Sequence, residues 1–131
     1  MKKIDELNDE EIREKNLFKR PQELPPAGEY EVVYVGSKPP PESWKDKSAF
    51  RHYFSLNYNK KEFFAGLIEP IKPRRYSLIA LMFRLLADKE PDEDSDISKY
   101  TGNPIRISVK RCQATKSGLW FLKVTNFHPL F

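Results

Sequence analysis

Three neighbouring segments decide the fold class: Ile105-Arg-Ile-Ser-Val-Lys110, Ala114-Thr-Lys-Ser-Gly118 and Gly118-Leu-Trp-Phe-Leu-Lys-Val-Thr-Asn126. In the first segment apolar and polar residues alternate, which is typical of a strand with one dry side and one water-facing side. Gly118 lacks a Cβ and adopts positive φ easily, so the middle segment predicts a turn. Together the three segments predict a β-hairpin.

This predicted hairpin is strongly basic. Between residues 99 and 131 the sequence holds six Lys and Arg residues and no Asp or Glu. The water-facing side of the first strand carries Arg106 and Lys110, and Trp120 lies on the returning strand. A cationic surface with an aromatic side chain is typical of proteins that bind polyanions, and nucleic acid fits both features best. The same basic side could also be an ordinary solvated surface, and the sequence leaves both interpretations open.

The overall composition predicts one soluble domain. The chain has 131 residues, 39% hydrophobic and 32% charged, with a formal net charge of +4, and this length is enough to bury a core. Residues 28–86 carry a net charge of +4, residues 87–98 carry −5 and residues 99–131 carry +6. Two basic segments are therefore separated by one short acidic segment.

Several features bear on location. No apolar run approaches the roughly 20 residues that a membrane helix needs, and the first residues lack the apolar stretch of a signal peptide. The single cysteine, Cys112, cannot form an internal disulfide. We therefore expect a cytoplasmic protein of the host-cell interior that is neither secreted nor bound to a membrane.

The order of the predicted elements points to a particular barrel. We expect strands at residues 29–35, 49–57 and 62–68, a buried helix at 78–87 capped by Ser77, and then the two strands of the hairpin. This order is that of an OB-fold, a five-stranded, partly open barrel with a helix between its third and fourth strands. Residues 25–131 would form this mainly-β domain. Residues 1–24 would form an N-terminal charged arm, either a helix capped by Asn8 or a loose segment.

The OB-fold would place a binding face around its second and third strands and the two loops beside them. The second strand turns Arg51 and Tyr53 to the side away from Phe54, and His52 is expected to be a satisfied, half-buried side chain rather than a catalytic base. Trp44 lies in a proline-rich loop and could either stack on a base or fold back on the sheet. Either Trp120 or Phe121 must face outward. The predicted nucleic-acid contacts are Lys38, Trp44, Lys47, Arg51, Tyr53, Arg106, Lys110, Lys116 and Trp120.

Two segments carry a family resemblance. The passage Pro25-Pro-Ala-Gly-Glu-Tyr-Glu-Val-Val-Tyr-Val35 and the passage Tyr100-Thr-Gly-Asn-Pro-Ile-Arg-Ile-Ser-Val109 resemble small OB-fold single-stranded-DNA-binding proteins of phages and mobile genetic elements. The resemblance covers residues 25–131. It implies sequence-tolerant binding of single-stranded nucleic acid in replication, recombination or repair, with DNA favoured over RNA and the choice between them left open. It also implies replication or recombination proteins as partners, although the acidic tail that often recruits them is missing from residues 126–131.

The sequence gives less support to other classes of function. The sequence has no Gly-rich phosphate loop and no Ser/His/Asp or Cys/His pairing in a recognisable context, so we expect no enzyme and no cofactor. Residues 88–96 lack the glycine and the ligand spacing of a calcium loop, so we expect no metal. A protein-binding adaptor or inhibitor of viral or mobile-element origin is the alternative. A homodimer formed through an edge strand or through residues 127–131 stays open.

Overall fold

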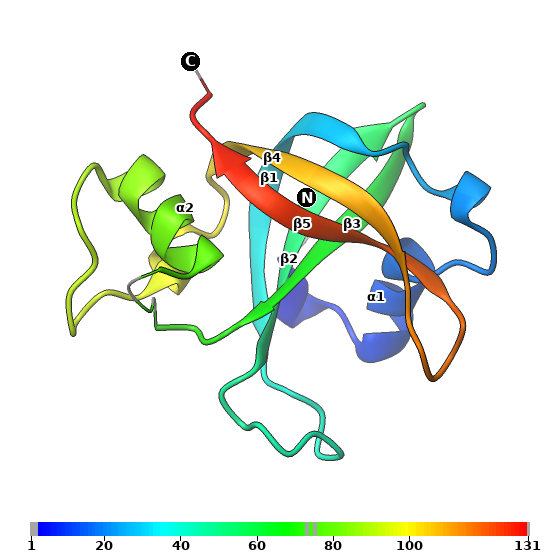
Figure 1. Ribbon diagram of the computed structural model, residues 1–131, viewed down its shortest axis with the longest axis horizontal. Helices are drawn as coiled ribbons and strands as arrows, with labels where there is room; N and C mark the ends of the chain where they lie inside the picture. Colours follow the sequence, from blue (N-terminus) through cyan, green and yellow to red (C-terminus); the bar gives the residue numbers. More distant parts are fainter. Residues whose placement is uncertain (1–2, 73, 75, 131) are drawn as a thin grey trace.

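Five strands form a closed barrel in the computed structural model, which describes residues 3–72, 74 and 76–130 (Figure 1). Around the barrel the order is β1-β2-β3-β5-β4, and β4 pairs again with β1. All neighbours are antiparallel except β3 and β5, which are parallel. The strands are β1 (Gly28–Lys38), β2 (Phe50–Tyr58), β3 (Lys61–Glu69), β4 (Pro104–Gln113) and β5 (Trp120–His128). The prediction of a mainly-β, five-stranded barrel is confirmed.

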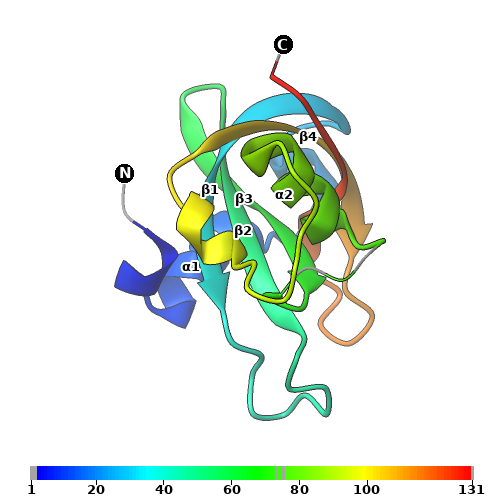
Figure 2. The same cartoon turned by 90° about the vertical axis from the view of Figure 1, so that its left-hand side faces the viewer.

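Two α-helices lie against separate sides of this barrel (Figures 1 and 2). Helix α1 (Asp9–Asn16) precedes β1, and helix α2 (Leu78–Ala87) lies between β3 and β4 in the chain. The Ser77 side chain accepts a hydrogen bond from the Ala80 amide and so caps α2, as the sequence predicted. The 3-10 segments are η1 (Ile4–Glu6), η2 (Pro21–Glu23) and η3 (Ile97–Tyr100). None of the helices among the described residues combines the length and the apolar character needed to cross a bilayer.

The barrel core follows the predicted alternation. In β4 the side chains of Ile105, Ile107 and Val109 are buried, while Lys110 faces water. Buried side chains of α2, among them Met82, pack into the same core. Apolar burial of this kind is the main favourable contribution to folding.

His52 is part of this core. It is 0% exposed, and its Nε2–H donates to the Glu69 carbonyl at 2.9 Å. Its Nδ1 therefore accepts from the Tyr34 hydroxyl at 3.0 Å. Burial lowers the pKa of His52 to about 4, so the ring is neutral at pH 7. The predicted hydrogen bonding of His52 is confirmed, but the prediction of a half-buried side chain is wrong, because the ring is completely buried.

Strand β1 differs from the prediction because it does not end at Gly36. Its register against β2 shifts between Tyr34 and Gly36, and the strand then continues to Lys38. Gly36 has φ +113, which a residue with a Cβ adopts only with strain. A Cβ at this position would also lie 2.8 Å from Cγ2 of Ile4. The bulge thus lets the N-terminal segment pack directly on the backbone of β1.

Candidate nucleic-acid interface

Two neighbouring parts of the outer barrel surface contain most of the predicted strand contacts. We call the outer side of β2 and β3 the covered face and the outer side of β4 and β5 the open face. Strand pairing joins them, because Tyr53 lies opposite Gly66, Gly66 pairs with Lys123, and Lys123 lies opposite Lys110. The covered face comprises Arg51, Tyr53, Ser55, Glu62 and Phe64, and the open face comprises Arg106, Lys110, Phe121, Lys123 and Thr125.

The covered face lies under the N-terminal segment, defined here as residues 4–16. Tyr53 is only 5% exposed and Phe64 only 1% exposed, although both belong to the outer side of the barrel. They form a second apolar cluster, separate from the barrel core, whose members are Ile4, Leu7, Ile12, Val35, Tyr53 and Phe64. The ring of Tyr53 is therefore not accessible to a base while the N-terminal segment is in place. The predicted arm is a packed part of the fold.

Local sequence explains why α1 forms. The side chain of Asn8 accepts from the Glu11 amide at 2.8 Å, and the side chain of Glu11 accepts from the Asn8 amide at 3.2 Å. This is a capping box, and Leu7 and Ile12 stand at the two positions of a hydrophobic staple around it. Both staple residues belong to the second apolar cluster. The signal for a docked helix was thus present in residues 7–12.

Polar contacts tie the N-terminal segment to predicted site residues. The ammonium of Lys38 donates to the Leu7 carbonyl at 2.9 Å, and Nη1 of Arg51 lies 3.8 Å from a carboxylate oxygen of Asp9. Arg51 also donates two hydrogen bonds, of 3.2 and 2.9 Å, to the Pro39 carbonyl. Both predicted cations are therefore occupied by oxygen atoms of the protein itself.

Glu62 adds an ion pair to the covered face. Its carboxylate pairs with the ammonium of Lys15 on α1 and accepts a hydrogen bond from the Ser55 hydroxyl. Burial raises the pKa of Glu62, but the hydrogen bonds from Lys15 and Ser55 outweigh that effect, and the pKa lies below its ordinary value. Lys15 also lies over the ring of Phe64, with its Nζ 5.4 Å from the ring centroid.

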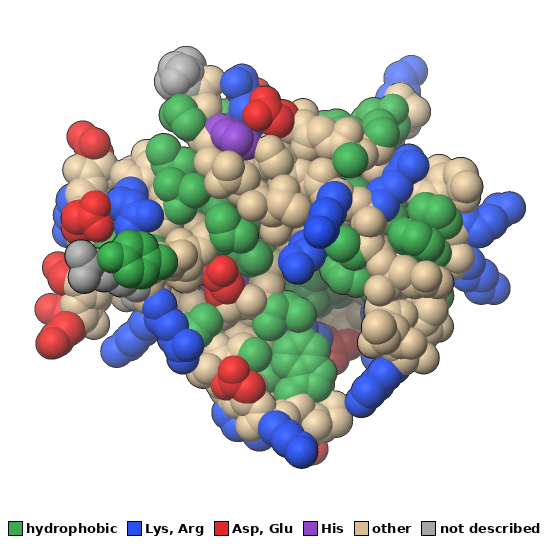
Figure 3. Space-filling model, in the orientation of Figure 1, with side chains coloured by type: hydrophobic (Ala, Val, Ile, Leu, Met, Phe, Trp, Pro, Cys, Tyr) green, Lys and Arg blue, Asp and Glu red, His purple; other side chains and the backbone are tan. Residues whose placement is uncertain are grey.

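The loops beside these faces carry three further predicted contacts. The β1–β2 loop, residues 39–49, holds Trp44 and Lys47, and the β4–β5 loop, residues 114–119, holds Lys116. Trp44 is half-buried, Lys116 is exposed, and exposed Lys47 donates to the Glu42 carbonyl at 2.8 Å. Figure 1 shows both loops projecting beyond the same end of the barrel, and Figure 3 shows a hollow in the surface between them.

The open face presents two adjacent lysines. Lys110 and Lys123 are exposed and lie directly opposite each other in the β4–β5 ladder. Among the described residues, the ion pairs involve neither of them. Gly66 of β3, which pairs with Lys123, adds no side chain beside it.

The aromatic residue on the open face is Phe121 and not the predicted Trp120. Trp120 packs against the barrel core, on the same side of β5 as buried Leu122. Its backbone is fixed by two hydrogen bonds to Phe18, of 2.9 and 2.7 Å. Phe121 therefore faces outward and is half-buried. The alternation in β5 left both possibilities, and packing decides between them.

Arg106 lies farther along β4, where acidic residues accompany the cations. The β1–β4 register places Arg106 opposite Glu31. Nearby, Nε2 of His128 lies 3.3 Å from a carboxylate oxygen of Glu29. Arg106 is thus brought to the open face but not to its most cationic part, which is near the β4–β5 loop.

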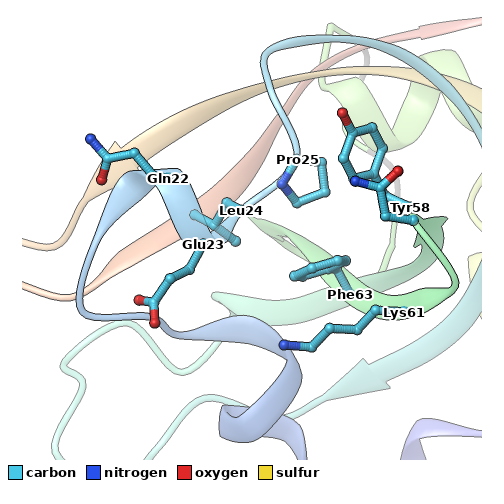
Figure 4. A pocket seen from close by; sticks show the side chains of 8 residues that line it. Gln22, Glu23, Leu24, Pro25, Tyr58, Lys61 and Phe63 are labelled. Atoms are coloured by element: carbon cyan, nitrogen blue, oxygen red, sulfur yellow. The ribbon is translucent and has the colours of Figure 1, made fainter.

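A separate pocket of about 160 Å³ lies beside the β2–β3 turn (Figure 4). Its Lys61 ammonium lies 5.2 Å from the ring centroids of both Phe63 and Phe18, a favourable cation–π arrangement. The lining also includes the carboxylate residue Glu23, which disfavours a phosphate. The lining residues are Gln22, Glu23, Leu24, Pro25, Tyr58, Asn59, Lys61 and Phe63, none of which is a predicted contact.

The described residues contain no group of three or more His, Cys, Asp or Glu side chains that could hold a metal ion.

Comparisons with known proteins add no family: no family model, no curated protein and no solved structure matches this chain. The resemblance to phage single-stranded-DNA-binding proteins therefore stays a prediction from the sequence. The candidate interface rests on its own geometry, above all on the exposed lysines of the open face.

Proposed function

We propose that this protein binds single-stranded DNA with little sequence preference and acts in replication, recombination or repair. The strand order β1-β2-β3-β5-β4, with α2 between β3 and β4 in the chain, supports an OB-fold-like barrel. Such barrels commonly bind oligonucleotides across the outer surface between their first and fourth loops. In this chain the corresponding region is the hollow between residues 39–49 and 114–119.

The observation that carries the proposal is the pair Lys110 and Lys123. Like charges placed directly opposite each other in a β-ladder destabilise the sheet. The β4–β5 hairpin contains no acidic residue to balance them. A bound phosphate would remove this repulsion, and the release of counterions from the nucleic acid would supply further binding free energy.

The open face also offers a surface for bases. Phe121 faces the same side of β5 as Lys123, two residues away, so a ring and a cation are neighbours there. The hollow lies between the β1–β2 loop, which holds Trp44 and Lys47, and the β4–β5 loop, which holds Lys116. Stacking on such rings contributes about 1–3 kcal/mol per base and tolerates any base, because each base has a π-face.

Fluorescence anisotropy with a labelled oligothymidine of about 20 nucleotides, longer than one OB-fold site, tests the proposal. We expect binding at micromolar protein and about 50 mM salt, weaker binding to duplex, and weaker binding to the matching RNA strand. The double variant Lys110→Ala/Lys123→Ala should lose about tenfold in affinity. Its slope of log affinity against log salt should fall by about 1.4, since each single-strand phosphate contact contributes about 0.7.

The control is Lys89→Ala/Lys99→Ala, which removes the same charge from exposed positions outside both faces. It should keep the wild-type affinity within about twofold. Equal losses in the two double variants would mean that net charge alone acts, and the assignment to the open face would be wrong. No binding of single strand by the wild-type protein would contradict the proposal and favour the protein-binding alternative.

A further inference from the structure

We infer that the N-terminal segment is an internal competitor of the single strand. It occupies the covered face in the free protein, and a bound strand displaces it to reach Tyr53 and Phe64. This inference rests on the proposed function. It adds that the N-terminal segment regulates the binding surface, and that Tyr53 and Phe64 complete this surface once the segment has left.

The covered face has the composition of a stacking surface. The rings of Tyr53 and Phe64 lie side by side on the outer side of the barrel, with their centroids 6.1 Å apart. The cations of Arg51 and Lys38 lie at its border and both reach residues of the N-terminal segment. Two neighbouring rings with flanking cations form the arrangement that holds unpaired bases and their phosphates.

The N-terminal segment resembles the proposed ligand in charge. Residues 4–16 contain six acidic and two basic side chains, so an acidic segment lies over a strand face with basic residues at its border. Asp9 offers its carboxylate to Arg51, and Leu7 offers its carbonyl oxygen to Lys38. Phosphate oxygens of a single strand could replace both, because guanidinium and ammonium groups bind phosphate and carboxylate alike.

The attachment has a weak point next to the open face. Among the described residues, the Oδ1 atom of Asn16, at the end of α1, is buried without a hydrogen-bond partner, which destabilises the docked state. This atom lies 3.9 Å from the position that a Cβ of Gly66 would take, and Gly66 pairs with Lys123. The Asp9 side chain is 66% exposed, so its ion pair with Arg51 contributes little. A strand that binds Lys123 therefore meets α1 at the residue whose buried side-chain oxygen has no hydrogen-bond partner.

Hydrogen exchange of the full-length wild-type protein, with and without saturating oligothymidine, tests the displacement. We expect the amides of residues 9–16 to exchange about tenfold faster when the strand is bound, while amides of β4 and β5 become slower. If the protein binds the strand while residues 9–16 keep or gain protection, the segment is a fixed part of the barrel and the inference is wrong.

A pair of full-length variants measures the competition. Ile12→Ser weakens the second apolar cluster, and Glu14→Ser changes an exposed position of the same helix. We expect Ile12→Ser to bind oligothymidine about fivefold more tightly and Glu14→Ser to stay within about twofold of wild type. Adding Tyr53→Leu to Ile12→Ser should cancel the gain. A folded Ile12→Ser protein, checked by circular dichroism, that binds no more tightly than wild type would contradict the inference.

The two proposals fail in different ways. If neither the wild type nor Ile12→Ser binds single strand, the proposed function is wrong and the inference falls with it. If the wild type binds but α1 keeps its protection and Ile12→Ser shows no gain, only the inference is wrong. Binding by Ile12→Ser alone would support the competition but would contradict the proposed function of the wild-type protein.

Discussion

The covered face and the open face are built by the same rule, and they differ in what lies on them. In both, alternate side chains of two neighbouring strands point away from the core. On β2 and β3 these include two aromatic rings, which residues 4–16 bury. On β4 and β5 they include Lys110 and Lys123, which stay in water. Alternation thus identifies an outer side, but it does not tell whether another segment of the chain covers it.

The rings explain which face is covered. Tyr53 and Phe64 would together expose a contiguous apolar patch, and burying it against Ile12 and its neighbours is favourable. Burying the lysine pair would instead require the removal of two like charges from water. The N-terminal segment therefore docks on β2 and β3, and the lysines of β4 and β5 stay in water.

The largest expected effect tests whether the covered face is a true core. Phe64→Ala should lower the free energy of unfolding by about 3–5 kcal/mol, as at a buried position, since it leaves a cavity beneath α1. Phe121→Ala, on the open face, should cost about 1–2 kcal/mol because its ring is only half-buried. Urea denaturation measures both values. Equal costs would remove the energetic difference between the faces.

A second prediction concerns how the stability of the fold depends on pH. It also contrasts the two regions, because the buried His52 lies on β2, whereas the β4–β5 hairpin has no carboxylate. Burial holds the pKa of His52 at about 4, below the 6.5 of an unfolded chain, so protonation favours unfolding. This contribution to stability is complete above pH 6.5 and is lost as the pH falls to about 4. The expected loss is about 3 kcal/mol.

Urea denaturation between pH 7 and pH 4 measures this loss. His52→Gln should remove the His52 part of the pH dependence, and His128→Gln, which changes the partly exposed histidine, should retain it. An unchanged pH dependence in His52→Gln would show that another group is responsible.

The smallest expected effect concerns the lysine pair. Lys123→Thr removes the repulsion with Lys110 and places a β-branched residue in a strand, so it should stabilise the fold by about 0.2–1 kcal/mol at low salt. The gain should shrink at about 1 M salt, where charges are screened. Lys116→Thr, in the β4–β5 loop, is the matched control and should change stability less. Destabilisation by Lys123→Thr would show that the pair is no liability to the free protein.

Much of the barrel could be predicted because its signals are local. The helix predicted at residues 78–87 is α2 itself, and the alternation in β4 identified its buried side correctly. The docking of residues 4–16 does not follow from their composition, because few of these residues are apolar. The capping box of Asn8 and the staple of Leu7 and Ile12 were the available signals.

The interface was harder to predict because it depends on contacts between distant segments. Tyr53 was expected to stack on a base, but whether it is accessible depends on a helix about 40 residues earlier in the chain. The sequence pattern of β5 allowed the Trp120 side chain to point either toward the core or away from it. In the structure it points toward the core, and its backbone pairs with that of Phe18. Lys110 and Lys116, by contrast, are exposed as the sequence suggested.

The backbone pairing between Phe18 and Trp120 has a consequence for self-association. Among the described residues, β3 and β5 pair at one position, Gly66 with Lys123. Within the described ranges, part of each strand's edge therefore has no partner strand along this junction, which we call the seam of the barrel. Phe18 satisfies both backbone hydrogen-bonding groups of Trp120 at the start of β5. An unpaired edge is a template for pairing with another molecule. The stretch that follows α1 therefore shields the seam, and it favours a protein that stays dispersed rather than one that polymerises edge to edge.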